Sequence, residues 1–389
     1  MNPQKIIVSK LFSDEEMLLK KGTWITENDI HHPIISNDTD VYWLDNDNHE
    51  HLLLKFRKNV IHDDLIQLGW DSYKDLAKAS RGRGASAGPI DANSDYWKKR
   101  TLKHTNKWST GYLSPKGNQM KKELDLLELS TLQNMIQQHT IPYSDEEFND
   151  KDHLVFLLIQ HQGGVSKMKV NNQVASNPIG FYESSKNLGA DLPCRLTHFT
   201  RTNFEKYNEG LPFIQKINSL FHELIPDAHQ KQSQRANLKP HLTIPETCFS
   251  TITINRNFRT AIHQDAGDFK DGFGNLTVIE EGYYHGGYTV FPQFGVAIDL
   301  RTNDFVAMDV HQWHANTPFY ETNEDILLNQ DIISSFNDNP DVGTAGLYKQ
   351  YTRISFVCYL REKIANCANQ EDIDPQFLTK SGHDRIKSE

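Results

Sequence analysis

The stretch that decides the fold is residues 251–318, which read TITINRNFRTAIHQDAGDFKDGFGNLTVIEEGYYHGGYTVFPQFGVAIDLRTNDFVAMDVHQWHANTP. An alternating run at its start ends in a His-x-Asp pair, His263 and Asp265, and a second histidine, His314, follows another alternating run near its end. Such alternation is typical of half-buried strands. Two histidines and one carboxylate fill half of an octahedral shell around iron(II) and leave the other half open for a co-substrate and oxygen. The stretch therefore predicts a metal centre carried by strands.

Short apolar or alternating segments, separated by glycines and Asp/Asn turns, fill the rest of this stretch. The strands that we expect lie at residues 276–280, 288–291, 296–300 and 305–308. Short strands at close spacing after one long helix favour a β-sandwich or jelly roll over βαβ units. The predicted fold class is therefore mainly β with flanking helices (α+β).

The first alternating run defines one face of a strand. If that strand is regular, Asn255, Asn257, Arg259 and His263 share this face, and Asp265 lies just beyond it. Residues 266–268 (AGD) supply a turn, which would let both ligands of the His-x-Asp pair reach one ion. For the third ligand we expect His314, because the chain leaves its strand there; His311 is the alternative.

An arginine lies within an apolar segment near the C-terminus, YTRISFVCYLRE. Oxygen activation at such a centre normally needs a chelating 2-oxo acid, whose far carboxylate requires a buried cation. Because an unpaired arginine in an apolar strand is costly, Arg353 is predicted to hold that carboxylate. A structural salt bridge is the alternative role for Arg353, and Arg361, at the charged end of the strand, is the weaker candidate.

Two upstream segments are rich in cations. Residues 77–91 read AKASRGRGASAGPID, where glycines let backbone amides approach an anion and Arg81 and Arg83 add charge-assisted hydrogen bonds; a plain turn is the alternative. Residues 96–116 read YWKKRTLKHTNKWSTGYLSPK, in which cations lie beside rings such as Trp97 that can stack on bases. The alternative for this segment is a solvated face anchored by core tryptophans.

The rest of the chain predicts fewer regular elements. We expect strands at residues 41–44 and 52–56 and helices at residues 121–139 and 203–225, with Pro212 either kinking the second helix or marking its first turn and the segment from Pro226 ending it. Residues 153–161 fit a strand or a helix equally. The polar residues 165–186 are expected to form a loop over the site or an irregular surface connection.

Composition limits the function classes. The chain of 389 residues has a formal net charge of -10, which argues against binding nucleic acid by bulk electrostatics but is compatible with a local basic groove. The four cysteines have no C-x-x-C pairing, so reduced thiols are expected. The N-terminus lacks the apolar region of a signal peptide, and no apolar run of about 18 residues occurs. We expect an intracellular protein, cytoplasmic or nuclear, with no membrane partner.

The expected organisation is one compact unit. Residues 1–190 would form an N-terminal elaboration that contributes to substrate binding, and residues 191–365 the core. Residues 320–349 are interpreted as an insertion, which would act as a lid, and residues 366–389 as a polar tail.

Four segments resemble the catalytic domain of the TET/JBP dioxygenases, the ten-eleven-translocation and base J-binding proteins. They are NRNFRTAIHQDAGDF, GNLTVIEEG, GGYTVFPQFGVAIDLRTNDFVAMDVHQWHANTP and TRISFVCYLR. The resemblance is closest to the thymine-hydroxylating J-binding-protein side and its microbial or viral relatives. The chain departs from the family in lacking the Cys-rich zinc region of animal TET enzymes and a recognisable J-DNA-binding module, and in carrying the 320–349 insertion.

The resemblance implies a double-stranded β-helix (jelly-roll or cupin-like) core with an N-terminal α/β elaboration. It also implies an oxidoreductase that uses iron(II), 2-oxoglutarate and O2 to hydroxylate the 5-methyl group of a pyrimidine, thymine or 5-methylcytosine, in DNA. By position, His263, Asp265 and His314 would bind the metal, Arg353 would bind 2-oxoglutarate, and Asn255 would be a further co-substrate contact. The residues expected to bind the substrate are Asp268, Arg81, Arg83, Trp97 and Arg259. The alternatives are an oxygenase with the same cofactors acting on a small molecule, free nucleotide or protein side chain, and a non-catalytic DNA-binding module.

Overall fold

One large mixed sheet organises the structure, a computed structural model that describes residues 2–80, 83–89, 112–166, 172, 174–187, 190–332 and 350–378. Its strand order is β1-β2-β3-β16-β12-β19-β11-β7-β10, with β4 paired to β7, and of these pairs only β1 and β2 run parallel. The strands are β1 (Gln4–Val8), β2 (Thr39–Leu44), β3 (Glu50–Arg57), β4 (Ala79–Ser80), β7 (Val174–Tyr182), β10 (Arg195–Leu196), β11 (Thr251–Arg256), β12 (Gly274–Glu281), β16 (Phe305–Met308) and β19 (Thr352–Tyr359).

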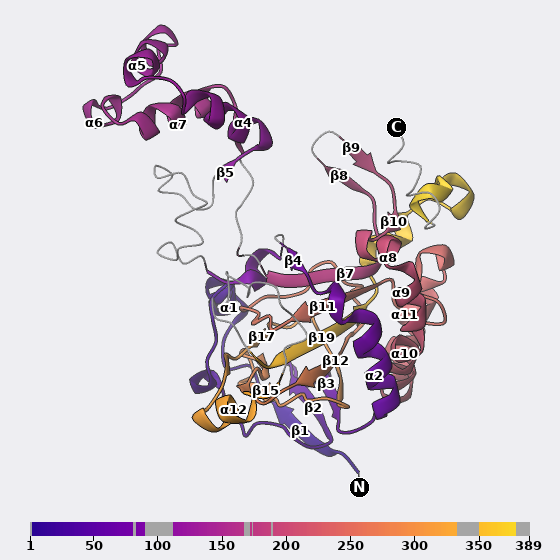
Figure 1. The fold of residues 1–389 in the computed structure, drawn as a ribbon. Coiled ribbons are helices and arrows are strands. Elements are labelled where there is room, and N and C mark those ends of the chain that lie inside the picture. Colours follow the sequence, from indigo (N-terminus) through magenta and orange to yellow (C-terminus); the bar gives the residue numbers. More distant parts are fainter. Residues whose placement is uncertain are drawn as a thin grey trace. The chain divides into compact units, whose positions relative to one another are not determined.

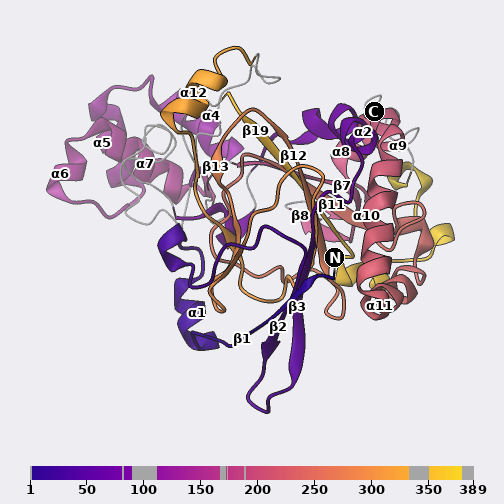
Figure 2. The ribbon, with the colours of Figure 1, turned by 90° about the horizontal axis from the view of Figure 1, so that it is seen from below.

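Helices cover one face of this sheet. Because successive strand residues point to opposite faces, the even-numbered apolar residues of β11 and β19 share one side, and there they join a single buried cluster with helical side chains such as Phe213 and Phe221. Figures 1 and 2 show α10 and α11 together along this side of the sheet, with α2 nearby. The helices that contribute to this cluster are α2 (Asp63–Tyr73), α9 (Phe204–Glu209), α10 (Leu211–Leu224) and α11 (Pro226–Ala236).

A smaller sheet packs against part of the opposite face. It has the order β15-β14-β17, with bounds β14 (Thr289–Phe291), β15 (Val296–Ile298) and β17 (Ala315–Asn316). Phe291, Val296 and Ile298 of this sheet join a second buried cluster with Leu276 and Val306 of the large one. Next to it lies the short pair β13 (His285–Gly286) and β18 (Phe319–Tyr320). Two facing sheets with helices on the outside confirm the predicted α+β class with a double-stranded β-helix core.

The predicted strands and helices correspond to observed elements with shifted ends. The strands expected at residues 41–44, 52–56, 276–280, 288–291, 296–300 and 305–308 are β2, β3, β12, β14, β15 and β16. Residues 203–225 form α9 and α10, separated at Gly210, where an added Cβ would collide with the ring of Tyr73. Pro212 lies in the first turn of α10 and causes no kink, which settles the alternative left open by the sequence.

The expectation of an irregular segment at residues 165–186 is wrong. Residues 165–186 include β7, a long and largely buried strand between β11 and β10. Its polar residues were misleading because their side chains are hydrogen-bonded within the fold: Oγ of Ser176 donates to Oδ1 of Asn255 on β11, and the amide of Asn177 donates to the carbonyl of Lys78, next to β4. The helix expected at residues 203–225 ends at Leu224, as predicted, but the chain does not become irregular there, because Pro226 occupies the first turn of a new helix, α11.

Residues 89–172 form a compact unit separate from residues 1–88 and 173–389. Its described part contains β5 (Tyr112–Leu113), α4 (Pro115–Leu124), α5 (Leu129–Gln138), α6 (Asp145–Phe148), α7 (Lys151–His161) and β6 (Val165–Ser166). The helix expected at residues 121–139 is therefore two helices. Leu124 and Leu132 lie on either side of the break between these helices and are buried in the same cluster. The helical spacing of apolar residues therefore continues across the break, which is why the sequence predicted a single helix. Residues 153–161 are helical and belong to α7.

The domain boundaries proposed from the sequence stay predictions. The N-terminal strands β1, β2 and β3 extend the large sheet that also contains the proposed core strands. The described part of the 320–349 insertion contains a short helix, α12 (Asn323–Leu328), and residues 333–349 lie outside the described ranges. In the proposed tail, Cys367 and Ile373 are buried in a cluster with Leu196 and Leu242.

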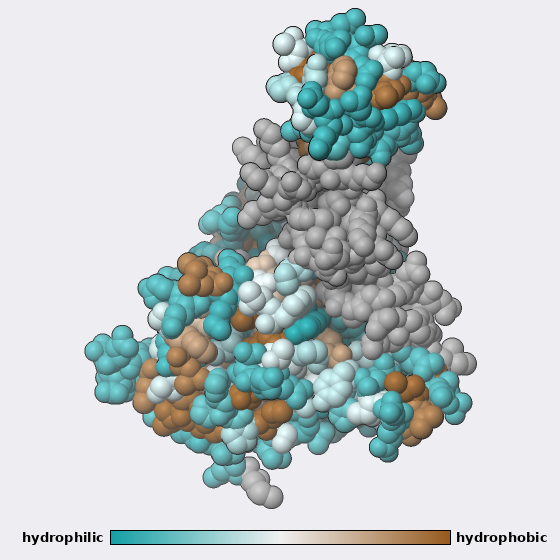
Figure 3. Space-filling view, turned by 90° about the vertical axis from the view of Figure 1, so that its left-hand side faces the viewer, coloured by the Kyte–Doolittle hydropathy of each residue, from teal (hydrophilic) through white to brown (hydrophobic). Residues whose placement is uncertain are grey.

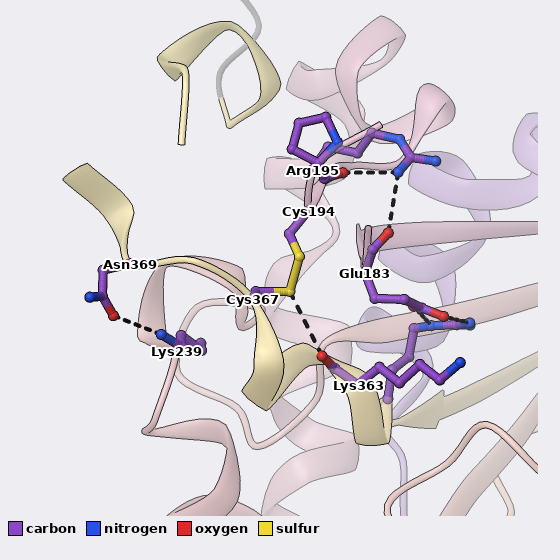
Figure 4. The surroundings of a disulfide bond; sticks show 9 residues. Glu183, Cys194, Arg195, Lys239, Lys363, Cys367 and Asn369 are labelled. Atoms are coloured by element: carbon purple, nitrogen blue, oxygen red, sulfur yellow. Dashed lines mark hydrogen bonds and ion pairs between the residues drawn. A yellow bond between two sulfur atoms is a disulfide. The ribbon is translucent and has the colours of Figure 1, made fainter. Parts of the chain in front are cut away.

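The expectation of reduced thiols is wrong for two of the four cysteines. Cys194 and Cys367 form a disulfide with Cα atoms 6.0 Å apart, whereas Cys248 and Cys358 are free and buried. Figure 4 shows the bond beside β10, close to Glu183 and Lys363. The two cysteines are 173 residues apart in sequence, and the fold alone brings them together, so their spacing carried no signal.

Among the described residues, no helix is both long enough and apolar enough to cross a membrane. Exposed leucines do occur on α1 (Asp14–Lys20) and α12, which lie on the side of the molecule seen in Figure 3. That view shows hydrophobic side chains in separate groups among hydrophilic ones.

Candidate metal centre and active-site cavity

His263 and His314 lie side by side on neighbouring segments. The two residues form an isolated antiparallel bridge, in which the backbone N–H of His263 donates to the carbonyl of His314 at 3.0 Å and that of His314 donates to the carbonyl of His263 at 2.9 Å. A further backbone bond, from the N–H of Asp265 to the carbonyl of Val310 at 3.1 Å, holds the carboxylate residue in the same place. The fold therefore brings all three predicted metal ligands together.

The hydrogen bonds of the imidazoles orient their free nitrogens toward one point. Nδ1 of His263 lies 2.8 Å from the carbonyl of Ala261, and Nδ1 of His314 lies 2.9 Å from the carbonyl of Gln312. Because a carbonyl only accepts, both Nδ1 atoms carry a hydrogen, so in the neutral imidazoles Nε2 has the lone pair that a metal needs. Each Nε2 is 3.6 Å from an oxygen of Asp265, and the three ligand atoms lie within 4.8 Å of one another.

Two of the three groups of the triad, His263 and Asp265, are held in the form that binds a divalent cation. Burial, and then the neighbouring His314, lowers the pKa of His263 to about 4. Burial opposes the ionisation of Asp265, but its hydrogen bond with His314 and the charges of both histidines lower its pKa to about 2. For His314, burial is outweighed by the bond to Asp265, which raises the pKa above 6.5. Among the described residues, the cluster contains one carboxylate and two imidazole nitrogens and no fourth ligand. This is the open facial set of a mononuclear iron(II) site.

The triad lines a cavity of about 270 Å³ between the sheets. Because successive residues of β19 point to opposite faces, one face of this strand lines the cavity and the other is buried in the helix-covered core. The residues of β19 that line the cavity are Arg353, Ser355, Val357 and Tyr359. Other apolar and polar walls come from β11, β12, β16 and the loops that follow β4 and β11. The lining includes Arg83, Ser176, Thr253, Asn255, Phe258, Asp268, Leu276, Met308, Asn316 and Arg361.

Arg353 has the properties expected of an anion-binding residue. It is only 4% exposed, and its Nη2 atom is buried without a hydrogen-bond partner. Its guanidinium lies 5.6 Å from the ring centroid of Phe319. No ion pair with Arg353 occurs among the described residues, so the structure gives no support to the alternative of a structural salt bridge. A buried, charged and unsatisfied donor in a cavity fits a ligand carboxylate.

The weaker candidates, His311 and Arg361, are used elsewhere. Nε2 of His311 lies 3.1 Å from the carbonyl of Phe269, and His311 is not part of the triad cluster. Arg361 lines the cavity but makes a two-pronged ion pair with Glu183, with its Nη2 2.6 Å from Oε1. Glu183 was not expected from the sequence, because only the pairing of β7 with its neighbours brings it to Arg361.

Asn255 and Asp268 both reach the cavity. Asn255 accepts a hydrogen bond from the hydroxyl of Ser176 and donates to Oγ of Ser355 at 3.2 Å, so its amide joins β7, β11 and β19. Oδ2 of Asp268 is buried and has no partner. Burial, and then the charge of Asp265, holds the pKa of Asp268 well above its usual range. Their expected contacts with co-substrate and substrate stay predictions.

The predicted cationic contacts separate into three groups. Arg83 lines the cavity, and its charge contributes to the low pKa of Asp265. Arg259 does not line the cavity: its Nη2 donates to the carbonyl of Ile25 at 2.6 Å and its guanidinium lies over Trp24. The regular strand assumed for residues 251–265 ends at Arg256, which explains why Arg259 leaves the predicted face. Arg81 and Trp97, with most of residues 96–116, lie outside the described residues.

Comparison with known proteins agrees with this geometry. Residues 178–362 match a family model described as Tet_JBP, the oxygenase domain of the 2OGFeDO superfamily. A bifunctional helicase and thymine dioxygenase JBP2 of Trypanosoma cruzi is 33% identical over 198 residues, which are 50% of this chain and 16% of that protein. Thymine dioxygenase JBP1 of Trypanosoma brucei brucei is 33% identical over 155 residues, which are 40% of this chain and 17% of that protein.

These relatives are much longer than the matched region, which spans about a sixth of their length. A solved structure of NgTET1 in complex with 5mC DNA aligns with 100% of this chain and 92% of that chain, at 10% identity and a TM-score of 0.45, a likeness too weak to support a conclusion. The resemblance stated from the sequence is confirmed by the family match, which contains the complete triad and Arg353. Residues 178–362 are thus similar to the oxygenase domain of the Tet_JBP family, within the 2OGFeDO superfamily.

Proposed function

We propose that the protein is an iron(II)- and 2-oxoglutarate-dependent dioxygenase that hydroxylates the 5-methyl group of a pyrimidine, thymine or 5-methylcytosine, in DNA. The observation that carries this proposal is the convergence on one cavity of the triad and of the buried guanidinium of Arg353, whose Nη2 has no hydrogen-bond partner. The matched family supports the cofactors, and the names of the relatives, thymine dioxygenases, support a methylpyrimidine substrate.

In this proposal each group of the site has one role. The Nε2 atoms of His263 and His314 and the carboxylate of Asp265 hold iron(II), and Arg353 binds the far carboxylate of 2-oxoglutarate. Asn255 is a further co-substrate contact. When bound, the iron, 2-oxoglutarate and O2 supply the oxidation that converts a methyl into a hydroxymethyl group. The Nδ1 bonds to backbone carbonyls fix both imidazoles, so the ligands need no reorganisation when the metal arrives.

The remaining residues of the cavity position the substrate and keep water out. Leu276, Met308 and Val357 give the cavity apolar walls. We assign Asp268, whose buried Oδ2 has no partner, to a hydrogen bond with the base. Because a base inside a duplex could not reach this buried centre, the target nucleotide would have to leave the stack. We assign the binding of the strand to the N-terminal part of the chain, through Arg81, Arg83 and Trp97, and the proposed compartment is that of the DNA, cytoplasm or nucleus.

The test is a direct product analysis. Protein loaded anaerobically with iron(II) is given 2-oxoglutarate, O2 and either thymine- or 5-methylcytosine-containing DNA, and the digested nucleosides are examined by mass spectrometry. We expect a hydroxymethylated base from at least one of the two DNAs, dependent on 2-oxoglutarate. If 2-oxoglutarate is consumed but neither DNA is modified, the reaction type stands and the substrate is wrong.

Binding measurements separate DNA from a small substrate. A protein that grips phosphates with cations releases counterions, so its affinity for duplex DNA should fall steeply as salt is raised. No binding of duplex DNA even at low salt would favour an oxygenase acting on a small molecule, a free nucleotide or a protein side chain.

A further inference from the structure

At the end of β11, a side-chain oxygen takes the place of a backbone carbonyl as a hydrogen-bond acceptor. β11 pairs with β19 in a regular antiparallel register as far as Arg256, opposite Ile354, so the next pair would be Asn257 and Arg353. One half of that pair is present, because the N–H of Asn257 donates to the carbonyl of Arg353 at 2.9 Å. In a regular ladder the N–H of Arg353 would donate back to the carbonyl of Asn257. Here it donates to the side-chain Oδ1 of Asn257, at 2.7 Å.

The backbone of Asn257 explains this exchange. Its φ of 46° lies in the left-handed region, which turns the chain out of the sheet at that residue. Asparagine is one of the few residues other than glycine that tolerate this conformation, and it also supplies an amide. The amide makes one further bond, from Nδ2 of Asn257 to the carbonyl of Tyr351, the residue before β19, at 3.2 Å. One residue thus ends β11 and still satisfies both backbone groups of Arg353.

This exchange lies between the two halves of the proposed site. After Asn257 the chain leaves the sheet and reaches His263 and Asp265, whereas Arg353 stays in the sheet with its guanidinium against Phe319. If the N–H of Arg353 lost its acceptor, a buried donor would be left unsatisfied at the residue that needs a fixed position. We infer that Asn257 is a positioning residue that sets the place of Arg353, and hence of 2-oxoglutarate, relative to the metal ligands. This inference rests on the proposed function.

The test compares three forms of the protein. Asn257→Gly keeps the left-handed backbone and removes both side-chain bonds, whereas Asn257→Asp keeps an acceptor for Arg353 and removes only the donor to Tyr351. Binding of 2-oxoglutarate to the iron(II)-loaded protein is measured anaerobically by calorimetry, with iron(II) binding measured separately. We expect Asn257→Gly to weaken 2-oxoglutarate binding about tenfold, with iron(II) affinity unchanged, and Asn257→Asp to recover most of the loss. In turnover, the KM for 2-oxoglutarate should rise while kcat changes little.

Asn303 provides a matched control. It is also left-handed, with φ of 70°, and its Nδ2 donates to the carbonyl of Ile61 at 2.7 Å, but it does not line the cavity. Asn303→Gly should cost stability and leave 2-oxoglutarate binding as in the wild type. Unchanged 2-oxoglutarate binding in Asn257→Gly would overturn the inference, as would an equal loss of iron(II), 2-oxoglutarate and DNA binding, which indicates a general structural role. A wild-type protein that binds iron(II) but not 2-oxoglutarate would instead overturn the proposed function.

Discussion

At the level of single residues, the histidines near the metal centre differ in which ring nitrogen is hydrogen-bonded to a backbone carbonyl. His263 and His314 use Nδ1 for a backbone carbonyl and keep Nε2 free, whereas His311 has its Nε2 at a carbonyl. His263→Ala should therefore lose iron(II) binding and product formation, since two ligands bind far more weakly than three. His311→Ala is the control, and it should keep both. Metal analysis after gel filtration and the nucleoside assay provide the measurements; full activity of His263→Ala would contradict the ligand assignment.

The ion pair between Glu183 and Arg361 predicts a pH effect on stability. Burial opposes the ionisation of Glu183, but its hydrogen bonds and charge interaction with Arg361 lower the pKa below 4.5. The folded protein then holds this proton less tightly than the unfolded chain, so the pair stabilises the fold above pH 4.5 and the contribution is lost as the pH falls through the lower, folded-state pKa. Glu183→Gln should reduce stability near neutral pH and flatten the acid side of the profile, measured by denaturant unfolding. An unchanged profile would show that the pair is energetically neutral.

The residues found from the sequence share one property: their chemistry is unusual for their place. A His-x-Asp at a strand end and an arginine inside an apolar strand are visible without a structure. Glu183 and Asn257 had no such signal, because their roles depend on partners that are 178 and 96 residues away in the chain. Arg259 was assigned wrongly to the ligand face because β11 ends three residues earlier.

Among secondary-structure elements, the contact between α2 and α10 depends on a missing side chain. A Cβ at Gly69 would come within 2.9 Å of the ring of Phe213, which is fully buried. Gly69→Ala should therefore destabilise the protein by about 1–3 kcal/mol, because the two helices must separate or the ring must move. Gly267→Ala is the control, since the nearest atom to its Cβ would be 4.0 Å away. Thermal or denaturant unfolding measures both; equal stability of the two variants would contradict this packing.

Strands with apolar alternation were predictable, and strands with polar cores were not. β12, β14, β15 and β16 follow a pattern that requires burial on at least one side. β7 contains Ser176 and Asn177, whose side-chain hydrogen bonds, to Asn255 of β11 and to the carbonyl of Lys78 beside β4, offset the cost of burying them. A polar strand of this kind can be identified only when its partners are known.

For the whole molecule, the disulfide between Cys194 and Cys367 makes stability depend on redox conditions. It links residues 173 positions apart, and closing so long a loop in the unfolded chain corresponds to roughly 5 kcal/mol in the chain-entropy treatment. A dithiol reductant should therefore lower the melting temperature of the wild type. The Cys194→Ser/Cys367→Ser double variant should melt at the lower temperature with or without reductant. A wild type that melts identically in both conditions would show that the bond does not form or does not stabilise.

The same bond has a consequence for how the chain responds to being cut. All the residues proposed to bind the metal and 2-oxoglutarate lie between its two cysteines, inside a covalently closed ring of chain. A single proteolytic cut within that ring opens it without releasing either piece. Both fragments should migrate as one band on a non-reducing gel and separate only after reduction. Nicked protein would thus keep both fragments of its active site tethered in one molecule for as long as the two sulfurs stay joined.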